Sequence, residues 1–250
     1  MDGVSNEYRF SDFTRFQYRE LIQIAKRKFE FKRFSEGINE KTPCILWRHD
    51  VDISMHSALK LARIEKEEGV KSTFFLMLHC EFYNLLEREI LDIVSQIEAL
   101  GHEIGLHFDC DFYGITNEAQ LEKYLSIEKR IFKDLLNVEV KAFSFHNPSL
   151  NTMTYEAEYY DGLINAYSSK IKSKFSYCSD SNGYWRHQRL HDFLISDVGN
   201  YSQVLTHPAW WQDKAMSPFE RIKRSVEGRK EKNLTNYQDL LSNNGRHNVK

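Results

Sequence analysis

Strand-length apolar segments alternate with amphipathic helical segments over residues 44–145, and this alternation constrains the fold more than any other feature. The predicted strands cover residues 45–47, 71–78, 102–106 and 138–145, and the predicted helices cover 54–68, 84–100 and 121–136. Asn84 is expected to begin the second helix as its N-cap, and Gly69 and Gly101 to end the first two helices. Repeated strand–helix–strand crossovers give a parallel sheet with helices outside it, so we expect an α/β fold.

The later half of the chain is less regular. Residues 154–162 are predicted to be helical, residues 163–167, 190–196 and 203–206 to be strands, and a last helix to run from Ser217-Pro218 to about Lys232. An amphipathic helix over 13–29 is expected within an N-terminal extension, residues 1–40, and the polar residues 242–250 read as a frayed tail. Because no repeat or Pro/Gly-rich linker interrupts the chain, we predict one domain over 1–250.

Bulk composition excludes several classes of protein. The 250 residues carry a formal net charge of −2, which gives no reason to expect a nucleic acid or an anionic membrane as partner. No run of 18 apolar residues exists, so no membrane insertion is expected. The first 30 residues lack the basic start and apolar core of a secretory signal, and the four cysteines form no CxxC pair. We therefore expect a cytoplasmic protein with free thiols.

Polar side chains gather where the predicted strands end. The first strand runs into His49, Asp50 and Asp52, the third into His107, Asp109 and Asp111, and the others into His79, His146 and His207. In parallel α/β folds the carboxyl ends of the strands carry the chemistry. Removing a carboxylate from water at the end of a buried strand costs free energy, and a bound divalent metal offsets that cost. The alternative is that Asp52 or Ser54 simply caps the following helix.

The residues themselves favour some metal ligands over others. Asp52 and His107 form the best pair. The third ligand is left open between Asp111, which shares a face with His107 if the segment is helical, and Asp109, which suits an extended loop. Cys110 is a possible zinc thiolate, but it points away from both in either geometry and is expected to be a packing residue.

Several motifs in this order resemble the polysaccharide deacetylase superfamily, the carbohydrate esterases of family 4, and more closely a divergent branch from surface-polysaccharide gene clusters. The matching segments are Asp50-Val51-Asp52, Lys71-Ser72-Thr73-Phe74-Phe75, Gly101-His102-Glu103-Ile104-Gly105, His146-Asn147-Pro148 and the final His207. The resemblance spans about 45–208 and implies an irregular, incomplete (β/α) barrel.

The resemblance also implies roles for single residues. Asp50 falls on the catalytic base, Asp52 and His107 on metal ligands, and His207 on the general acid. Asp111 stands where the family usually has a second histidine ligand. His146 stands where the family has an arginine that orients the base, and a histidine there could still bond to Asp50.

Together these observations predict a metal-dependent hydrolase that removes an acyl group, most simply N-acetyl, from a small carbohydrate or sugar nucleotide in surface-polysaccharide biosynthesis. The expected cofactor is zinc, with cobalt or nickel as alternatives. Trp210 and Tyr184 are expected to bind substrate, as are Tyr113, Trp185 and Trp211 if they lie near the strand ends. The alternatives are an accessory sugar-binding protein that kept the fold without catalysis, and a phosphate-ester hydrolase, which the lack of a Gly-rich phosphate loop disfavours.

Overall fold

One mixed β-sheet organises the molecule. The computed structural model describes residues 8–37 and 41–249, so the first seven residues of the expected extension and the last residue of the expected tail lie outside it. The strands are β1 (Glu30–Lys32), β2 (Cys44–Val51), β3 (Thr73–Leu76), β4 (Glu103–Phe108), β5 (Ala142–Phe145), β6 (Tyr159–Tyr160), β7 (Leu163–Asn165), β8 (Ser176–Ser179) and β9 (Tyr201–Thr206). Their order is β6-β7-β5-β4-β3-β2-β9-β8, with β1 also paired to β2.

Most of the strand pairs are parallel, as the crossover pattern predicts. Among the pairs in the described residues, β6 with β7 is antiparallel and every other pair is parallel. The two ends of the strand order, β6 and β8, are not paired with each other in the described part of the chain. The sheet is therefore an open half-barrel, the irregular and incomplete barrel that the sequence led us to expect.

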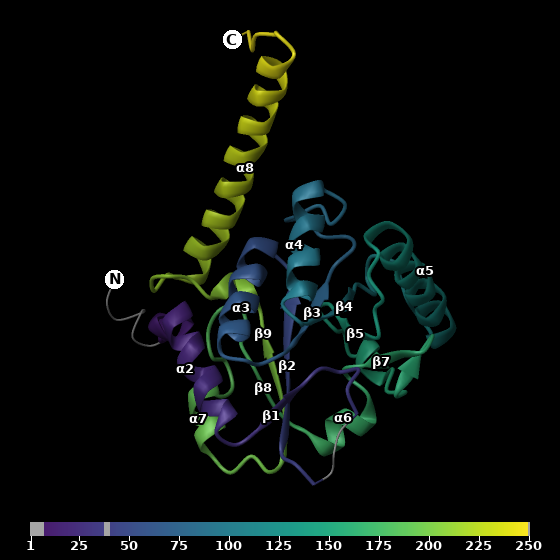
Figure 1. Ribbon diagram of the computed structural model, residues 1–250. Helices are drawn as coiled ribbons and strands as arrows, with labels where there is room; N and C mark the ends of the chain where they lie inside the picture. The colour runs from purple at the N-terminus through teal and green to yellow at the C-terminus, as the bar shows by residue number, and fades with distance from the viewer. Residues whose placement is uncertain (1–7, 38–40, 250) are drawn as a thin grey trace.

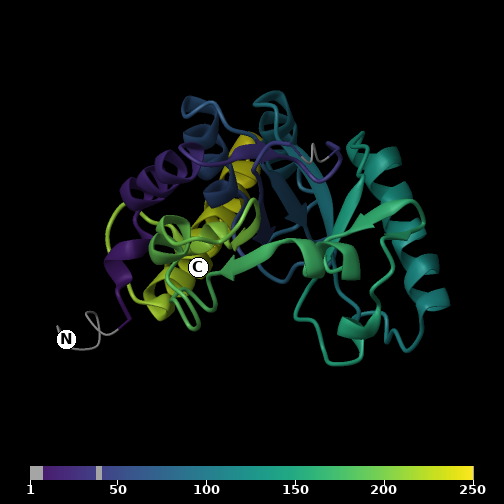
Figure 2. The same cartoon turned by 90° about the horizontal axis from the view of Figure 1, so that it is seen from below.

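Helices cover the outer side of this sheet. The α-helices are α2 (Arg15–Lys26), α3 (Met55–Glu67), α4 (Arg88–Ala99), α5 (Glu118–Leu136), α6 (Ser169–Lys174), α7 (Leu190–Ile195) and α8 (Pro218–Asn243), and short 3₁₀ turns are η1 (Phe10–Phe13), η2 (Thr152–Thr154) and η3 (Pro208–Trp210). Figure 2 shows α2, α3, α4 and α5 following one another around the sheet. Their apolar stripes pack into the main core, and the loops after the strands are left free to build a site.

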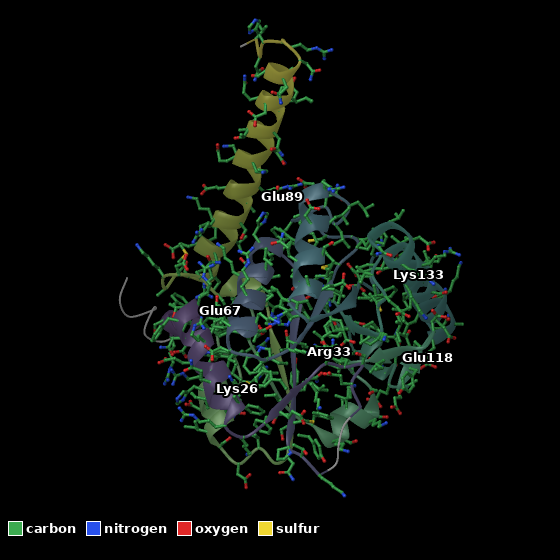
Figure 3. All side chains as sticks on the ribbon, viewed as in Figure 1. Lys26, Arg33, Glu67, Glu89, Glu118 and Lys133 are labelled. Carbon is green, nitrogen blue, oxygen red and sulfur yellow. The ribbon has the colours of Figure 1, made fainter. Side chains whose placement is uncertain are left out.

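The last helix departs from this arrangement. α8 begins at a capping box, in which Ser217 and Glu220 satisfy each other's backbone N–H, and then projects away from the body (Figure 1). Arg221 is its one buried residue among those described, and side chains of its outer half extend into solvent (Figure 3). No helix in the described residues is long and apolar enough to cross a membrane.

Strand β2 lies in the middle of the sheet and is buried along its whole length. Because side chains alternate across a strand, Arg48 and Asp50 face the concave interior, whereas Trp47 and His49 face the helices. On the helix side, His49 lies 2.8 Å from Glu65 through Nε2 and 2.8 Å from Thr206 Oγ1 through Nδ1. Glu65 also accepts hydrogen bonds from the hydroxyl of Tyr18 and, at 2.6 Å, from that of Ser72.

Several element predictions are wrong in instructive ways. Helix α4 begins at Arg88, not at Asn84, because Asn84 Oδ1 accepts the N–H of Leu86 in a tight turn. Residues 190–196, predicted as a strand, form α7. Residues 154–162, predicted as a helix, contain the end of η2 and the edge strand β6. Strands β1 and β8 and helix α6 have no counterpart in the prediction, and α8 is eleven residues longer than expected (Asn243 against Lys232).

Candidate active site

The predicted strand ends meet at one edge of the sheet. β2 leads into Asp52, β4 carries His107, β5 leads into His146 and β9 leads into His207. The pairing of β4 with β5 sets Ser144 opposite His107 and so brings His146 beside it. These residues lie far apart in the sequence, and the parallel register is what brings their side chains together.

Asp52, His107 and His146 form a compact group. The side-chain atoms of these three residues that could bind a metal all lie within 4.8 Å of one another. His107 Nε2 is 3.0 Å from Asp52 Oδ1 and 3.2 Å from His146 Nδ1. One carboxylate and two imidazoles are a donor set that suits a divalent metal, zinc among others.

An unsatisfied atom at the centre of this group tests whether a metal fits. Asp52 Oδ1 is buried and has no hydrogen-bond partner, although it lies close to His107. Burial raises the pKa of Asp52, but the neighbouring His107, His207 and His146 outweigh it and lower the pKa to about 2. An ionised, buried oxygen without a donor is costly unless a cation meets it, so the group present fits a divalent ion.

Ser144 fixes which nitrogen of His107 faces this group. The Ser144 hydroxyl donates to Asp50 Oδ1 at 3.3 Å, so it accepts from His107 Nδ1, which lies 2.7 Å away. Nε2 then keeps its lone pair and points at Asp52 and His146. A histidine whose Nδ1–H is held by a neighbour in this way presents its other ring nitrogen as a metal ligand.

Asp50 lies beside the group and is held by a buried cation. Arg48, on the same face of β2, is completely buried; its Nη2 is 3.4 Å from Asp50 Oδ2 and donates to the hydroxyl of Tyr167 at 2.8 Å. Burial lowers the pKa of Arg48, but Asp50 and Tyr167 more than offset this and raise it. The Nε and Nη1 atoms of Arg48 have no partner, so its guanidinium is not saturated by the fold.

His207 faces Asp52 from the other side and is oriented by Asp180. Its Nε2 is 3.6 Å from Asp52 Oδ2, and its Nδ1 is 2.5 Å from Asp180 Oδ1. Asp180 is buried and also accepts the backbone N–H of His207 at 3.0 Å. Burial lowers the pKa of His207, but Asp180 and then Asp52 raise it to about 9, so this imidazole carries a proton at neutral pH.

A cavity of about 320 Å³ opens onto these groups. It is lined by Asp50, Asp52, His107, His146, Asp180 and His207, and by Tyr167, Leu205, Trp210 and residues of the loops after β5 and β8. Such a volume is at the low end for a small-molecule site. Asp50, the group of Asp52, His107 and His146, and His207 therefore border one space.

The structure places the remaining sequence candidates elsewhere or at the rim. Asp109 Oδ1 accepts the backbone N–H groups of Asp111 and Phe112, and the Asp111 side chain is exposed. Neither carboxylate belongs to the group formed with Asp52 and His107, where His146 is the third member. Cys110 is buried in the core, as its reading as a packing residue requires.

The aromatic candidates divide in the same way. Trp210 lines the cavity, and its Nε1 is buried without a partner. Tyr184 packs edge-on against Tyr8 and does not line that cavity. Trp211 is fully buried in the core, and the indole N–H of Trp185 donates to Asp12 at 3.1 Å.

Sequence reasoning missed Arg48, Ser144 and Asp180. A signal existed for Arg48, because it stands two residues before Asp50 and so shares its face of the strand. Asp180 follows β8, a short and half-exposed strand whose hydrophobic pattern is weak. Ser144 shows its role only through the register of β5 against β4.

Comparison with known proteins gives similar solved structures. No family model matches the chain, and no curated protein matches it. Similar structures include a family 4 carbohydrate esterase from Bacillus anthracis, at 18% identity over 86% of each chain with a TM-score of 0.43. The catalytic domain of a peptidoglycan N-acetylglucosamine deacetylase from Eubacterium rectale is similar at 17% identity, covering 78% of this chain and 89% of that one, with a TM-score of 0.46. A family 4 pseudoenzyme from Bacillus anthracis is similar at 15% identity over 76% and 63%, with a TM-score of 0.43. Two of these three structures, the esterase and the pseudoenzyme from Bacillus anthracis, are of carbohydrate esterase family 4, which the sequence also resembles.

Proposed function

We propose that this chain is a metal-dependent hydrolase that removes an acyl group, N-acetyl in the simplest case, from a sugar. The observation that carries the proposal is the unsatisfied buried Oδ1 of Asp52 between two imidazoles, flanked by a carboxylate on one side and a protonated histidine on the other. Metal site, base and acid thus border a single cavity.

Asp52, His107 and His146 would hold the metal, with His146 taking the third position for which the sequence offered Asp109 or Asp111. A bound zinc, cobalt or nickel ion supplies a Lewis acid that polarises the acyl carbonyl and acidifies a water molecule. The N and O ligands fit these ions and do not single one out.

The chain's own residues perform the proton transfers. Asp50 accepts a proton from the attacking water, while Arg48 and Ser144 hold its two oxygens in place. His207, protonated and fixed by Asp180, gives its proton to the departing nitrogen. In this scheme the base is oriented by Arg48, which lies two residues before Asp50 on the same strand, and not by His146.

Free acetate released from N-acetylated sugars, measured with and without added zinc, cobalt or nickel, tests the proposal. The expected result is metal-dependent release, together with about one metal ion per chain by mass spectrometry on untagged protein. Sugar binding without acetate release, and without bound metal, would instead support the accessory sugar-binding protein.

A further inference from the structure

A cavity separate from the proposed metal site lies between the first half of α8 and the body of the molecule. Its volume is about 340 Å³, which is in the range of small-molecule sites. It is lined by the start of α3, by the segment that leads into α4 and by residues between 224 and 232 of α8 (Figure 1). None of the residues assigned above to metal binding or proton transfer lines it.

Two ion pairs lie at the end of this cavity toward the tip of α8. Arg229 Nη2 is 2.6 Å from Glu87 Oε2, and Lys232 Nζ is 3.2 Å from Glu89 Oε2. Figure 3 labels Glu89 where the start of α4 lies beside α8. Each pair joins α8 to the start of α4 and carries no net charge. The two cations at this end of the cavity are therefore already matched by carboxylates.

The other end of the cavity carries an excess of positive charge. Lys60 of α3 and Arg224 of α8 line it, and neither forms an ion pair with a carboxylate in the part of the chain that the structure describes. The neighbouring Asp213 is paired with Arg15. Burial, Arg15 and Arg224 lower the pKa of Lys60, and Asp213 offsets this only in part. Three cations thus surround one carboxylate, and an anion between Lys60 and Arg224 would relieve their repulsion.

Arg224 is held in place before any ligand arrives. Its Nη1 donates to Gln212 Oε1 at 3.1 Å. Gln212 is only 6% exposed, lines the same cavity, and is anchored in turn by donating from Nε2 to the carbonyl of Ala209 at 2.8 Å. A guanidinium that is already oriented loses less freedom when it binds an anion, and its planar fork suits the oxygens of a phosphate.

Gly228 keeps the α8 side of the cavity open. It lies inside the helix, where glycine is less favourable than alanine, and a Cβ added to it would meet no atom within 4 Å. No close contact in the described residues therefore requires a glycine here. Ile53, Phe82 and Ile90 also line the cavity, so it offers apolar surface beside its charged end.

We propose that this cavity binds a phosphate group between Lys60 and Arg224, with room against Phe82 and Ile90 for an organic part of the ligand. A phosphate ester carries a charge of about −1.5 to −2 at neutral pH, which matches the two cations that lack carboxylates. Free phosphate and a phosphorylated small molecule share this chemistry. The inference is independent of the proposed function, because neither Lys60 nor Arg224 takes part in it.

Calorimetric titration with inorganic phosphate, uridine 5′-monophosphate and uridine tests this inference. Both phosphates are expected to bind and uridine is not. Replacing both cations, Lys60→Ala with Arg224→Ala, should weaken phosphate binding about 10-fold or more, because two charged contacts are lost. The matched control removes two exposed cations of α5, Arg130→Ala with Lys133→Ala, and should change nothing. Tighter binding of the nucleotide would identify a phosphorylated small molecule as the ligand, and equal binding would identify free phosphate.

Two further variants fix the position of the bound phosphate. His107→Ala removes a proposed metal ligand and should bind phosphate as the parent does. Gly228→Leu fills the cavity without changing its charge, so it should weaken phosphate binding about 10-fold or more without lowering Tm. Binding lost in His107→Ala but kept in the Lys60 and Arg224 double variant would assign the phosphate to the metal site and overturn the inference. No phosphate binding by the parent, uridine binding as tight as the nucleotide, or full affinity in Gly228→Leu would also overturn it.

Discussion

Strand β2 carries a buried polar cluster on each face, and the two clusters differ in how completely their atoms are paired. On the helix side both oxygens of Glu65 and both ring nitrogens of His49 have hydrogen-bond partners. On the concave side Asp52 Oδ1 and two nitrogens of Arg48 have none. A buried network in which every polar atom is hydrogen-bonded stabilises the fold. Buried polar atoms without partners indicate a site arranged to bind another molecule or ion. We therefore expect changes on the concave side to affect activity and changes on the helix side to affect stability.

The largest effect is expected at Asp50. Asp50→Asn keeps the shape of the side chain and removes the proton acceptor, so kcat should fall about 10³-fold. Metal content should stay close to that of the parent protein, because Asp50 is not in the ligand group. Acetate release and metal analysis on the same preparation measure both, with Asp134→Asn on the exposed side of α5 as control. Parent-like turnover would remove Asp50 from the role of base.

Glu65 tests the helix side. Glu65→Ala leaves His49, Ser72 and Tyr18 without their shared acceptor, which should lower the free energy of unfolding by about 3–5 kcal/mol. Urea denaturation measures this. Glu67→Ala, on the exposed face of the same helix, should change it by about 0.5 kcal/mol or less. If the two variants were equally stable, complete hydrogen bonding would not identify a cluster that stabilises the fold.

Metal affinity separates the candidate third ligands. His146→Ala should weaken zinc binding about 100-fold, whereas Asp109→Ala and Asp111→Ala should change it by less than about threefold, because their carboxylates lie outside the group. Titration against a competing chelator measures all three, with the exposed His191→Ala as control. A large loss in Asp111→Ala with none in His146→Ala would restore one of the two ligand sets that the sequence left open.

Arg48 is a positioning residue in this scheme. Arg48→Lys keeps the charge but replaces a planar donor with a point charge, so kcat should fall about 10-fold while KM and metal content stay near parent values. A change in KM alone would assign Arg48 to substrate binding. Loss of metal would show that Arg48 shapes the ligand group instead.

The smallest expected effect is a loss of folding stability at low pH. Burial raises the pKa of Glu65, but His49, His102 and Ser72 lower it below its usual value, and burial lowers the pKa of His102. A carboxyl with a lowered folded pKa stabilises the protein above its unfolded pKa of about 4.5, and that stability is lost as pH falls through the folded value. Because His102 is kept neutral in the folded protein, it adds a further loss of stability that starts as pH falls below about 6.5, the usual pKa of histidine. Stability should therefore decline on acidification from pH 7, and less steeply in Glu65→Gln; urea midpoints across pH measure this.

The sequence predicted the fold where structure is local and strongly patterned. The strands and helices between 44 and 145 follow from apolar runs and periodicity, and the polar strand ends identified Asp50, Asp52, His107, His146 and His207, which all line one cavity. The functional roles assigned to them remain proposals.

What the sequence could not give depends on long-range register or on turn geometry. His146 meets His107 only through the pairing of β5 with β4, and the turn fixed by Asp109 exposes Asp111, which helical spacing would have turned inward. Residues 190–196 were misassigned although Leu190, Phe193 and Leu194 have helical spacing, because the segment is short.

The two-sided strand also limits how this protein can change. Because side chains alternate with a period of two, a one-residue insertion or deletion before Asp50 would exchange the faces of His49 and Asp50. Glu65 would then meet a carboxylate in place of an imidazole, and the fold would fail before the chemistry did. The hydrogen-bond network on the helix side therefore constrains the strand register on which the concave-side cluster depends. In descendants of this chain, point substitutions around the cavity should be found far more readily than length changes in β2.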